Sequence, residues 1–533
     1  MLFYAKGRRK MKFTELEIPF DEAENYLMPA NKEKLNKLFY KDSNFDKIKR
    51  ETTYYLIGEK GSGKTAYSVY FCNNQFDNIV SKRYVISVDD YSKIIQMKKE
   101  GKLNYTHYIT LWKAILLIKL FATISEGEVA IFGGKSYNKI RKLLETYNFT
   151  KITQDSFSPV SFMDNSTFSS ELGSEISAPQ VAKVNGKTYA SNTQQTSSQS
   201  QVFVDRWVKF INDICEDLPS LKLKNHHYLF IDGIDTRPND ISYKEYTECV
   251  YPLVRAVYEI NADILAHIKD RKKGRLQIVL LTRLDIFARS GLGNPGSKIS
   301  DNAAFLNWSA TMNKSCYEDS EIYRLVNNMI KSNNNTTCDL SWNTFFKFKL
   351  RRDGQSQDSF AYLSRLTTLK PRDYVRILRI TQEQCKRSNT DTPSSEVINS
   401  DLFNRAYSTY FTDSIRTALS FYYNEDSIIL LFNFIKYIRR CNFTLEQISI
   451  SLDGYSKKKE LVEMFGEIES ILNLLFDFNM ICAVEKGPYF RWKYREVSVA
   501  NYDYHLPSES LAPGAKFAFH PALEKEFGLY LKH

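Results

Sequence analysis

Short apolar runs alternate with segments of helical spacing along the first part of the chain. Strand-like runs occur at residues 52–58, 83–91, 226–235 and 276–287. Segments 105–124, 204–218 and 243–268 place apolar residues three and four positions apart, as on one face of a helix. Strands that alternate with helices are typical of a parallel sheet covered by helices. We therefore predict an α/β fold over residues 46–310, with a parallel sheet sandwiched between helices.

The flanking regions have different textures. Residues 1–45 are basic and then amphipathic, and we expect a lead-in segment of one or two helices. Residues 311–400 have helical spacing and predict a helical unit. The tail, 401–533, mixes helices with two strand-like runs at 481–494 that meet at a Lys-Gly-Pro turn. This order of elements is typical of a winged helix.

A polar stretch interrupts the α/β pattern at residues 150–202. It is rich in Ser, Thr, Asn and Gln and has little periodicity. Residues 181–190 contain Asn-Gly between strand-forming residues, which is a hairpin signal. The stretch is therefore either a disordered polar insertion or a β-hairpin arm, and the Asn-Gly pair favours the arm.

Composition and the placement of the cysteines argue against several classes of protein. No apolar run approaches the length of about 20 residues that a membrane helix needs. The first residues lack the order of a signal peptide, and the eight cysteines include no CxxC pair. We therefore expect a cytoplasmic protein without a membrane partner, disulfide framework or zinc cluster. The net charge of +11 is compatible with a nucleic-acid partner and equally with an ordinary solvated surface.

The sequence GEKGSGKT at residues 58–65 matches the phosphate-loop pattern G-x-x-x-x-G-K-[ST]. An apolar strand precedes the loop, and a helical segment follows it. Such a loop turns backbone N–H groups toward phosphates, its lysine neutralises them, and its threonine hydroxyl binds Mg²⁺. We predict that ATP and Mg²⁺ bind here. The predicted nucleotide-binding residues are Gly58, Glu59, Lys60, Gly61, Ser62, Gly63, Lys64 and Thr65.

A phosphate loop needs an acidic residue at the end of a second strand to complete the Mg²⁺ site. Asp232 ends the apolar run in YLFIDGID and is the predicted metal ligand together with Thr65. The acids of SVDD at 87–90 and Asp285 are weaker alternatives. Motor ATPases often place a catalytic Glu directly after this Asp, but here the residue is Gly233. Either Asp235 acts as the base in its place, or hydrolysis is slow.

Two arginines are candidates for contact with the γ-phosphate. Arg283 follows the strand-like run that ends in IVLLT, and Arg372 follows Pro371 at a predicted helix start. Either arginine could instead form an ordinary surface ion pair. The basic run at 270–275 could supply an arginine across a subunit interface, although such runs are usually solvated.

Four motifs in order carry a resemblance to a known group: GEKGSGKT, FIDGID, LLTRLDIF with DNAAFLNWS, and KPRD. The chain resembles prokaryotic P-loop ATPases of the AAA+/STAND assemblage over roughly residues 15–380. It is most similar to a bacterial branch with D-G-[IL]-D and [KR]-P-R-D motifs, and residues 517–529 resemble a closing motif of that branch. The resemblance implies sensor roles for Arg283 and Arg372, a helical lid over 311–400 and homo-oligomers.

The tail offers a candidate reader of DNA. Basic residues on the predicted wing suit phosphate contact, and Tyr489, Phe490 and Trp492 suit stacking. The candidate DNA contacts are Lys486, Arg491, Lys493 and Arg495. Against this function, the third helix of the tail is acidic, with Glu460, Glu463, Glu467 and Glu469.

Two functions follow from these observations. The first is an ATPase whose nucleotide-dependent assembly or conformational switch acts with a partner or duplex DNA, in a defence or DNA-transaction system. The second is a STAND-like signalling switch that senses a trigger and activates a separate effector without binding DNA. Gly233 favours the switch, whereas the basic wing favours DNA.

Overall fold

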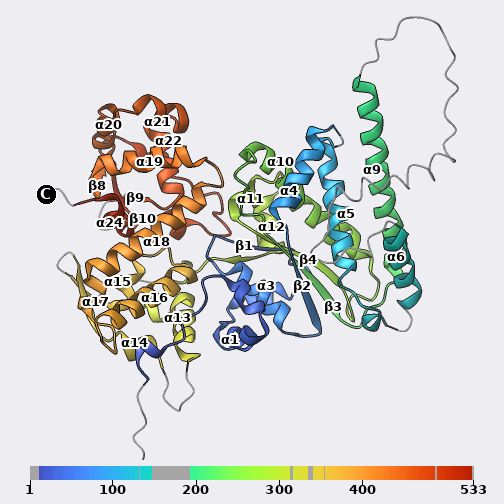
Figure 1. Cartoon of the computed structure of the whole chain (residues 1–533), viewed down its shortest axis with the longest axis horizontal. Coiled ribbons are helices and arrows are strands. Elements are labelled where there is room, and N and C mark those ends of the chain that lie inside the picture. Colours follow the sequence, from blue (N-terminus) through green and yellow to red (C-terminus); the bar gives the residue numbers. More distant parts are fainter. Residues whose placement is uncertain are drawn as a thin grey trace, which may run out of the picture. The chain divides into compact units, whose positions relative to one another are not determined.

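The computed structural model is divided into two compact units (Figure 1). One unit comprises Met1–Lys47, Gly58–Tyr70 and Phe305–His533, and the other comprises Ile48–Ile57 and Phe71–Ala304. The structure describes residues 11–101, 103–130, 133–146, 192–312, 316–333, 340–352, 355–485 and 489–530. The predicted hairpin at 181–190 and the turn residue Lys486 lie outside these ranges. No helix of the described chain is long and apolar enough to span a membrane.

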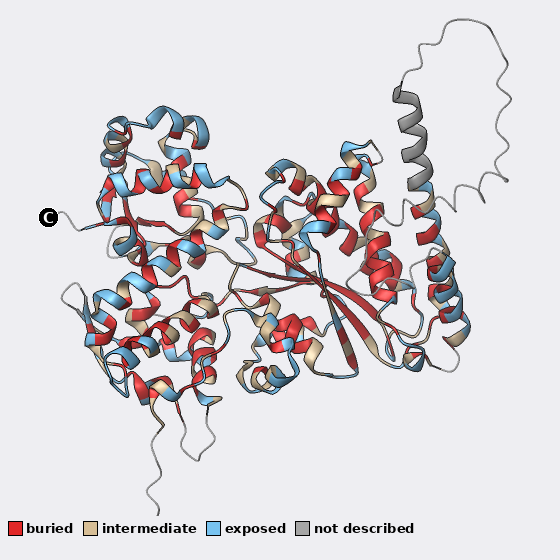
Figure 2. Cartoon of the chain, viewed as in Figure 1, coloured by how far each residue is buried: buried red, intermediate tan, exposed pale blue. Residues whose placement is uncertain are grey.

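A five-stranded parallel sheet forms the α/β core, as predicted. Its strand order is β2-β3-β4-β1-β5. The strands are β1 (Tyr55–Gly58), β2 (Ile79–Val85), β3 (His226–Asp232), β4 (Leu276–Thr282) and β5 (Ala303–Leu306). All of β4 and nearly all of β3 are buried, which explains their continuous apolar sequences (Figure 2). Because neighbouring strands are parallel, β1, β3 and β4 end at the same edge of the sheet.

Two predicted strands end earlier than expected, because a helix begins within each apolar run. The run at 83–91 does not end in acids, because β2 stops at Val85 and Asp89 and Asp90 begin helix α4 (Val88–Lys99). Ser87 caps this helix: its hydroxyl accepts from the Asp90 N–H at 3.1 Å, and the Asp90 carboxylate accepts from the Ser87 N–H at 2.9 Å. This reciprocal cap makes Ser-x-x-Asp a helix start. Likewise β4 stops at Thr282, and Asp285 lies in the first turn of α11 (Leu284–Arg289).

Several helices accompany this sheet (Figure 1). Their bounds are α3 (Lys64–Asn73), α5 (Tyr108–Phe121), α6 (Gly134–Thr146), α9 (Asn192–Asp217), α10 (Tyr243–Glu259) and α12 (Pro295–Asn302). Helix α5 is buried along most of its length, as predicted, and its Trp112 indole donates to the Cys249 carbonyl of α10 at 2.8 Å. Helix α9 begins at Asn192 rather than near 204. The sequence could not show this start, because the polar residues 192–202 have no apolar periodicity.

The region 311–400 is mainly helical, as predicted. Its helices are α13 (Glu321–Lys331), α14 (Trp342–Phe345), α15 (Ser359–Ser364), α16 (Pro371–Arg387) and α17 (Ser395–Asn399). A two-stranded antiparallel hairpin, β6 (Lys349–Arg352) with β7 (Gln355–Asp358), was not predicted. The N-terminal segment belongs to the same compact unit and contains α1 (Lys32–Leu38) and α2 (Ser43–Ile48, which ends at the unit boundary).

The tail contains both helices and a small sheet. The helices are α18 (Asp401–Leu419), α19 (Glu425–Ile438), α20 (Leu445–Asp453), α21 (Lys458–Phe465), α22 (Ile468–Asp477), α23 (Lys493–Glu496) and α24 (Glu524–Phe527). The strands β8 (Asn442–Thr444), β9 (Ile481–Val484), β10 (Phe490–Arg491) and β11 (Lys516–Phe519) form an antiparallel sheet in the order β10-β9-β11-β8. The predicted pair at 481–494 is therefore present, but β11 from the closing motif pairs with the other edge of β9.

The predicted acidic third helix is two helices, because the chain breaks at Gly466 between α21 and α22. Gly466 has φ +82°, a value that favours glycine. The four glutamates are therefore divided between two short helices and the turn that joins them.

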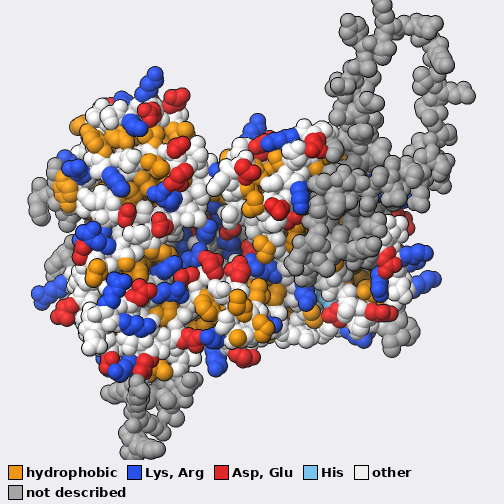
Figure 3. Space-filling model, in the orientation of Figure 1, with side chains coloured by type: hydrophobic (Ala, Val, Ile, Leu, Met, Phe, Trp, Pro, Cys, Tyr) orange, Lys and Arg blue, Asp and Glu red, His pale blue; other side chains and the backbone are white. Residues whose placement is uncertain are grey.

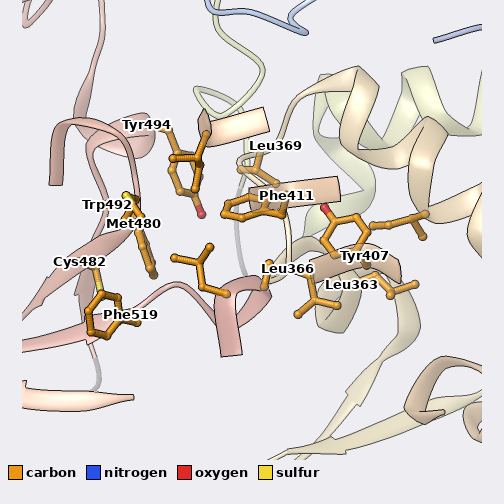
Figure 4. Packing of buried hydrophobic residues seen from close by; sticks show 14 of the residues in the cluster. Leu363, Leu366, Leu369, Tyr407, Phe411, Met480, Cys482, Trp492, Tyr494 and Phe519 are labelled. Atoms are coloured by element: carbon orange, nitrogen blue, oxygen red, sulfur yellow. The ribbon is translucent and has the colours of Figure 1, made fainter. Parts of the chain in front are cut away.

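One hydrophobic core joins α15, α16 and α18 to the C-terminal strands. Figure 4 shows Leu363, Tyr407 and Phe411 beside Met480, Trp492 and Phe519. The buried imidazole of His520 stacks on the Phe411 ring at 4.3 Å and meets the Trp492 ring edgewise at 4.9 Å. The regions predicted as a lid and a C-terminal domain thus share a core.

Candidate functional site

The phosphate loop runs from the end of β1 to the start of α3. Gly61 and Gly63 have φ values of +85° and +102°, which L-residues with side chains rarely adopt. The Ser62 N–H donates to the Glu59 carbonyl at 3.1 Å, which closes a tight turn between them. The loop therefore has the strand–turn–helix context that its sequence predicts, with a helix N-terminus directly after it.

Lys64 lies across this turn. Its side chain is buried at 5% exposure, and its ammonium donates to the Gly58 carbonyl at 2.8 Å and the Glu59 carbonyl at 3.3 Å. The cation is thus held at the inner side of the loop by the two carbonyls that begin it. An ammonium in this position can also meet an anion that approaches the N-terminus of α3.

The loop also accepts hydrogen bonds from the first residues of α16 and from the segment after β5. The Trp308 indole donates to the Ser62 carbonyl at 2.8 Å, and the Arg372 N–H donates to the Gly61 carbonyl at 3.4 Å. A Cβ at Gly61 would lie 3.3 Å from Cβ of Arg372, so the approach is close. Sequence reasoning gave Trp308 no role; its motif, DNAAFLNWS, was the only signal.

The KPRD motif shapes the start of α16 through Asp373. The buried carboxylate accepts from the Thr368 N–H at 2.9 Å, the Thr368 hydroxyl at 3.0 Å and the Tyr410 hydroxyl at 3.0 Å. These bonds hold the preceding turn, in which Leu369 has φ +57°. The motif acid is thus a structural residue that fixes the start of α16, at Pro371, and with it the position of Arg372.

The guanidinium of Arg372 contacts the N-terminal segment. Its Nη2 donates to the Asp21 carbonyl at 3.4 Å and pairs with the Glu22 carboxylate at 3.3 Å. Two further arginines of α16, Arg376 and Arg379, pair with the Asp21 carboxylate at 3.2 and 3.1 Å. The backbone of Arg372 therefore touches the loop while its charge is held by acids of the lead-in segment.

Asp232 ends β3, as predicted. Its Oδ2 pairs with Nη2 of Arg83 at 2.9 Å, and its Oδ1 accepts from the Gly233 N–H at 2.8 Å. Both side chains of the ion pair are nearly buried, with exposed fractions of 8% for Asp232 and 9% for Arg83. Sequence reasoning missed Arg83, because nothing in the run around it marks a partner for a distant acid.

Gly233 cannot be replaced by the glutamate of motor ATPases without a rearrangement. Its φ is +91°, and an added Cβ would lie 2.6 Å from the carbonyl oxygen of Ile86. The Ile86 N–H donates to the Asp232 carbonyl at 2.9 Å, so the two segments are fixed side by side. A side chain at this position would therefore require the two backbone segments to move apart.

Two buried tyrosines surround the turn that carries Asp235. The Tyr246 hydroxyl donates to the Ile234 carbonyl at 3.2 Å, and the Tyr91 hydroxyl donates to the Gly233 carbonyl at 3.5 Å. Burial is the main cause that raises the pKa of Tyr246; the charge of Asp235 raises it further and that of Arg283 lowers it. The sequence gave no signal for either tyrosine.

Arg283 follows β4, which lies between β1 and β3 in the sheet. Its guanidinium forms two bonds with the Asp285 carboxylate, Nε to Oδ1 at 3.0 Å and Nη2 to Oδ2 at 2.8 Å. The Asp285 carboxylate therefore orients the Arg283 guanidinium, and this gives Asp285 a structural role in the motif LLTRLDIF.

Asp232 and Thr65, the two predicted metal ligands, are oxygen donors. No cluster of three His, Cys, Asp or Glu residues that could hold a metal occurs in the parts of the chain that the structure describes. Mg²⁺ bound with a nucleotide needs no such cluster, because one or two protein oxygens and the phosphates are its usual ligands. The carboxylate of Asp232 and the hydroxyl of Thr65 are ligands of the required kind.

The predicted wing is largely ion-paired. Arg491 pairs with Glu485 at 2.5 Å, Lys493 pairs with Asp477 at 2.5 Å, and the Arg495 guanidinium donates to the Tyr494 hydroxyl at 3.2 Å. On the face drawn in Figure 3, basic and acidic side chains are intermingled. These contacts engage the basic side chains of the wing with partners from the same chain.

The wing aromatics divide into two kinds. Tyr489 and Phe490 are exposed, with exposed fractions of 47% and 39%. Trp492 is buried against His520, so its expected stacking on a base is wrong for this conformation.

Comparisons of the chain with family models, with curated proteins and with solved structures found no match.

Proposed function

We propose that the protein binds ATP with Mg²⁺ at the loop 58–65 and hydrolyses it slowly, as a nucleotide-held switch. The observation that carries this proposal is the geometry of the loop. The loop follows a buried strand and contains two glycines of positive φ, and the ammonium of Lys64, at the start of α3, donates to two loop carbonyls. The sheet order supports it, because β4 with Arg283 lies between β1 and β3.

Slow turnover follows from the turn after β3. Gly233 stands where a motor ATPase has a glutamate, and Asp235 is the nearest acid that could orient or deprotonate water. The helices that include α16 would act as a lid, with Arg372 sensing the γ-phosphate. Its charge is held by Glu22 in the present conformation, so nucleotide would have to draw it away.

The switch would act through a protein partner, either a second copy of the chain or a separate effector. The ion pairs of Arg491 and Lys493 favour this partner over duplex DNA. The helix–strand order of the tail, α19–β8–α20 followed by α22–β9, supports a winged-helix-like module. Modules of this kind also bind proteins.

The test of the proposal is nucleotide binding by Lys64→Ala. We expect a loss of at least about 100-fold in affinity for a fluorescent ATP analogue with Mg²⁺, because charge-assisted contacts of about 1.5–3 kcal/mol each are removed. Lys93→Ala, in α4, is the matched control and should bind as the wild type does. Unchanged affinity of a folded Lys64→Ala protein would overturn the proposal.

A further inference from the structure

The side chain of Arg83 is positioned on Asp232 by the register of two parallel strands. Val85 at the end of β2 lies opposite Asp232 at the end of β3, and Arg83 precedes it by two residues on β2. Residues two apart on a strand share a face, so the long side chain of Arg83 reaches along β2 to the carboxylate. The ion pair at 2.9 Å is thus built into the sheet.

Burial makes this pair important for a metal site. A carboxylate that is 8% exposed loses most of its hydration and needs a cation or hydrogen-bond donors nearby. The guanidinium and the Gly233 N–H together meet both of its oxygens. A metal ion that binds Asp232 must therefore share or displace Arg83 at Oδ2.

We propose that Arg83 is a positioning residue that occupies Asp232 until a nucleotide arrives, so that Mg²⁺ is taken up only together with the triphosphate. This inference rests on the proposed function. Without nucleotide, a Mg²⁺ ion on Asp232 would lie beside the Arg83 guanidinium, and the two cations would repel each other around a single carboxylate. The phosphates supply the negative charge that offsets both cations, and they give the displaced guanidinium a new partner.

A purely structural ion pair leads to a different expectation. Loss of Arg83 would then lower stability and leave the metal dependence of nucleotide binding unchanged. The two roles are therefore separated by direct metal binding in the absence of nucleotide, with Mn²⁺ as the paramagnetic probe in place of Mg²⁺.

The experiment measures Mn²⁺ binding by electron paramagnetic resonance in the full chain without nucleotide. We expect Arg83→Gln to bind Mn²⁺ at least about tenfold more tightly than the wild type, since a repelling charge beside Asp232 is removed. Arg83→Lys keeps the charge and should behave as the wild type does. Arg255→Gln removes the exposed partner of Glu259 instead and is the matched control.

If Arg83→Gln fails to fold, the double variant Arg83→Gln/Asp232→Asn replaces the ion pair with two amides. This protein should fold and bind no Mn²⁺ without nucleotide, whereas the single variant Asp232→Asn should keep a nucleotide site with weakened Mg²⁺ dependence. Mn²⁺ binding by the double variant, or a full Mg²⁺ dependence in Asp232→Asn, would contradict the inference.

Two failures can be told apart. If the wild type binds no ATP analogue with Mg²⁺, the proposed function is wrong. If it binds the analogue, but Arg83→Gln takes up Mn²⁺ no better than the wild type, only the role of Arg83 is wrong.

Discussion

Gly233 illustrates how a single residue can restrict the chemistry of a site. Its φ of +91° and the 2.6 Å approach of a Cβ to the Ile86 carbonyl are two separate penalties. The turn therefore keeps a glycine directly after Asp232, and under the proposed function Asp235 is the acid left to orient water. The constraint comes from a neighbouring backbone segment, so it is a property of the fold rather than of the reaction.

The two penalties can be measured separately. We expect Gly233→Ala to lower the free energy of unfolding by about 2–5 kcal/mol, from left-handed strain and overpacking together. Gly291 has φ +73° and open space around its Cβ position, so Gly291→Ala should cost only the strain, about 1–2 kcal/mol. Chemical denaturation gives both values. Equal costs would show that the close approach to Ile86 is relieved easily.

Asp235 is the residue on which turnover should depend. We expect Asp235→Asn to slow ATP hydrolysis by about 10²–10⁴-fold, as loss of a general base does, with nucleotide affinity unchanged. Single-turnover phosphate release measures the rate, and the ATP-analogue titration measures the affinity. Asp240→Asn, in the same loop and exposed, is the control. Wild-type turnover in Asp235→Asn would remove Asp235 as the base.

Helix α16 is the element that links the loop to the rest of its compact unit. Its N-terminus donates to the Gly61 carbonyl, and its arginines hold the acids of the lead-in segment. Asp373 fixes this start from within the core. Asp373 stands directly after Arg372 in KPRD, so the acid that fixes the start of the helix also fixes the place of the proposed sensor arginine.

The structural role of Asp373 predicts a loss of stability. Asp373→Ala leaves two donors of Thr368 and the Tyr410 hydroxyl without their buried acceptor, which should cost about 2–3 kcal/mol. Thermal unfolding measures the change, and Asp413→Ala, at an exposed position of α18, should leave it small. A protein of wild-type stability that lacks Asp373 would exclude this role.

For the whole molecule, the net charge of +11 is a weaker guide to the partner than the placement of the charges. Arg491 and Lys493, which the sequence offers as DNA contacts, each have an acidic partner at 2.5 Å. The proposed function therefore takes a protein partner rather than an extended phosphate backbone.

This preference has a measurable outcome. We expect Mg²⁺ with a non-hydrolysable ATP analogue to raise the molar mass in light scattering relative to ADP, and Lys64→Ala to abolish the rise. Duplex DNA added at physiological salt should change neither the mass nor the rate of ATP hydrolysis. Stimulation by DNA that is lost on reversing the charges of Arg491 and Lys493 would instead favour the DNA-acting ATPase.

Local sequence alone determined the phosphate loop, the buried strands β1, β3 and β4 and most helices, because glycine spacing and apolar periodicity are local signals. It placed Asp232 correctly at a strand end. It misplaced Asp89, Asp90 and Asp285, where a helix cap or a turn ends the strand earlier than the apolar run suggests.

Only the tertiary structure decided which charges meet. Arg83 and Asp232 are 149 residues apart and become partners through parallel strand pairing. The hydrogen bond from Trp308 to the loop and the ion pair between Glu22 and Arg372 likewise join residues that are far apart in the sequence. Periodicity records which face of an element is buried, but not which distant element covers it. The sequence of the loop therefore predicts its ligand, whereas the residues that contact the loop, and those that contact Asp232 and Arg372, were identified only by the fold.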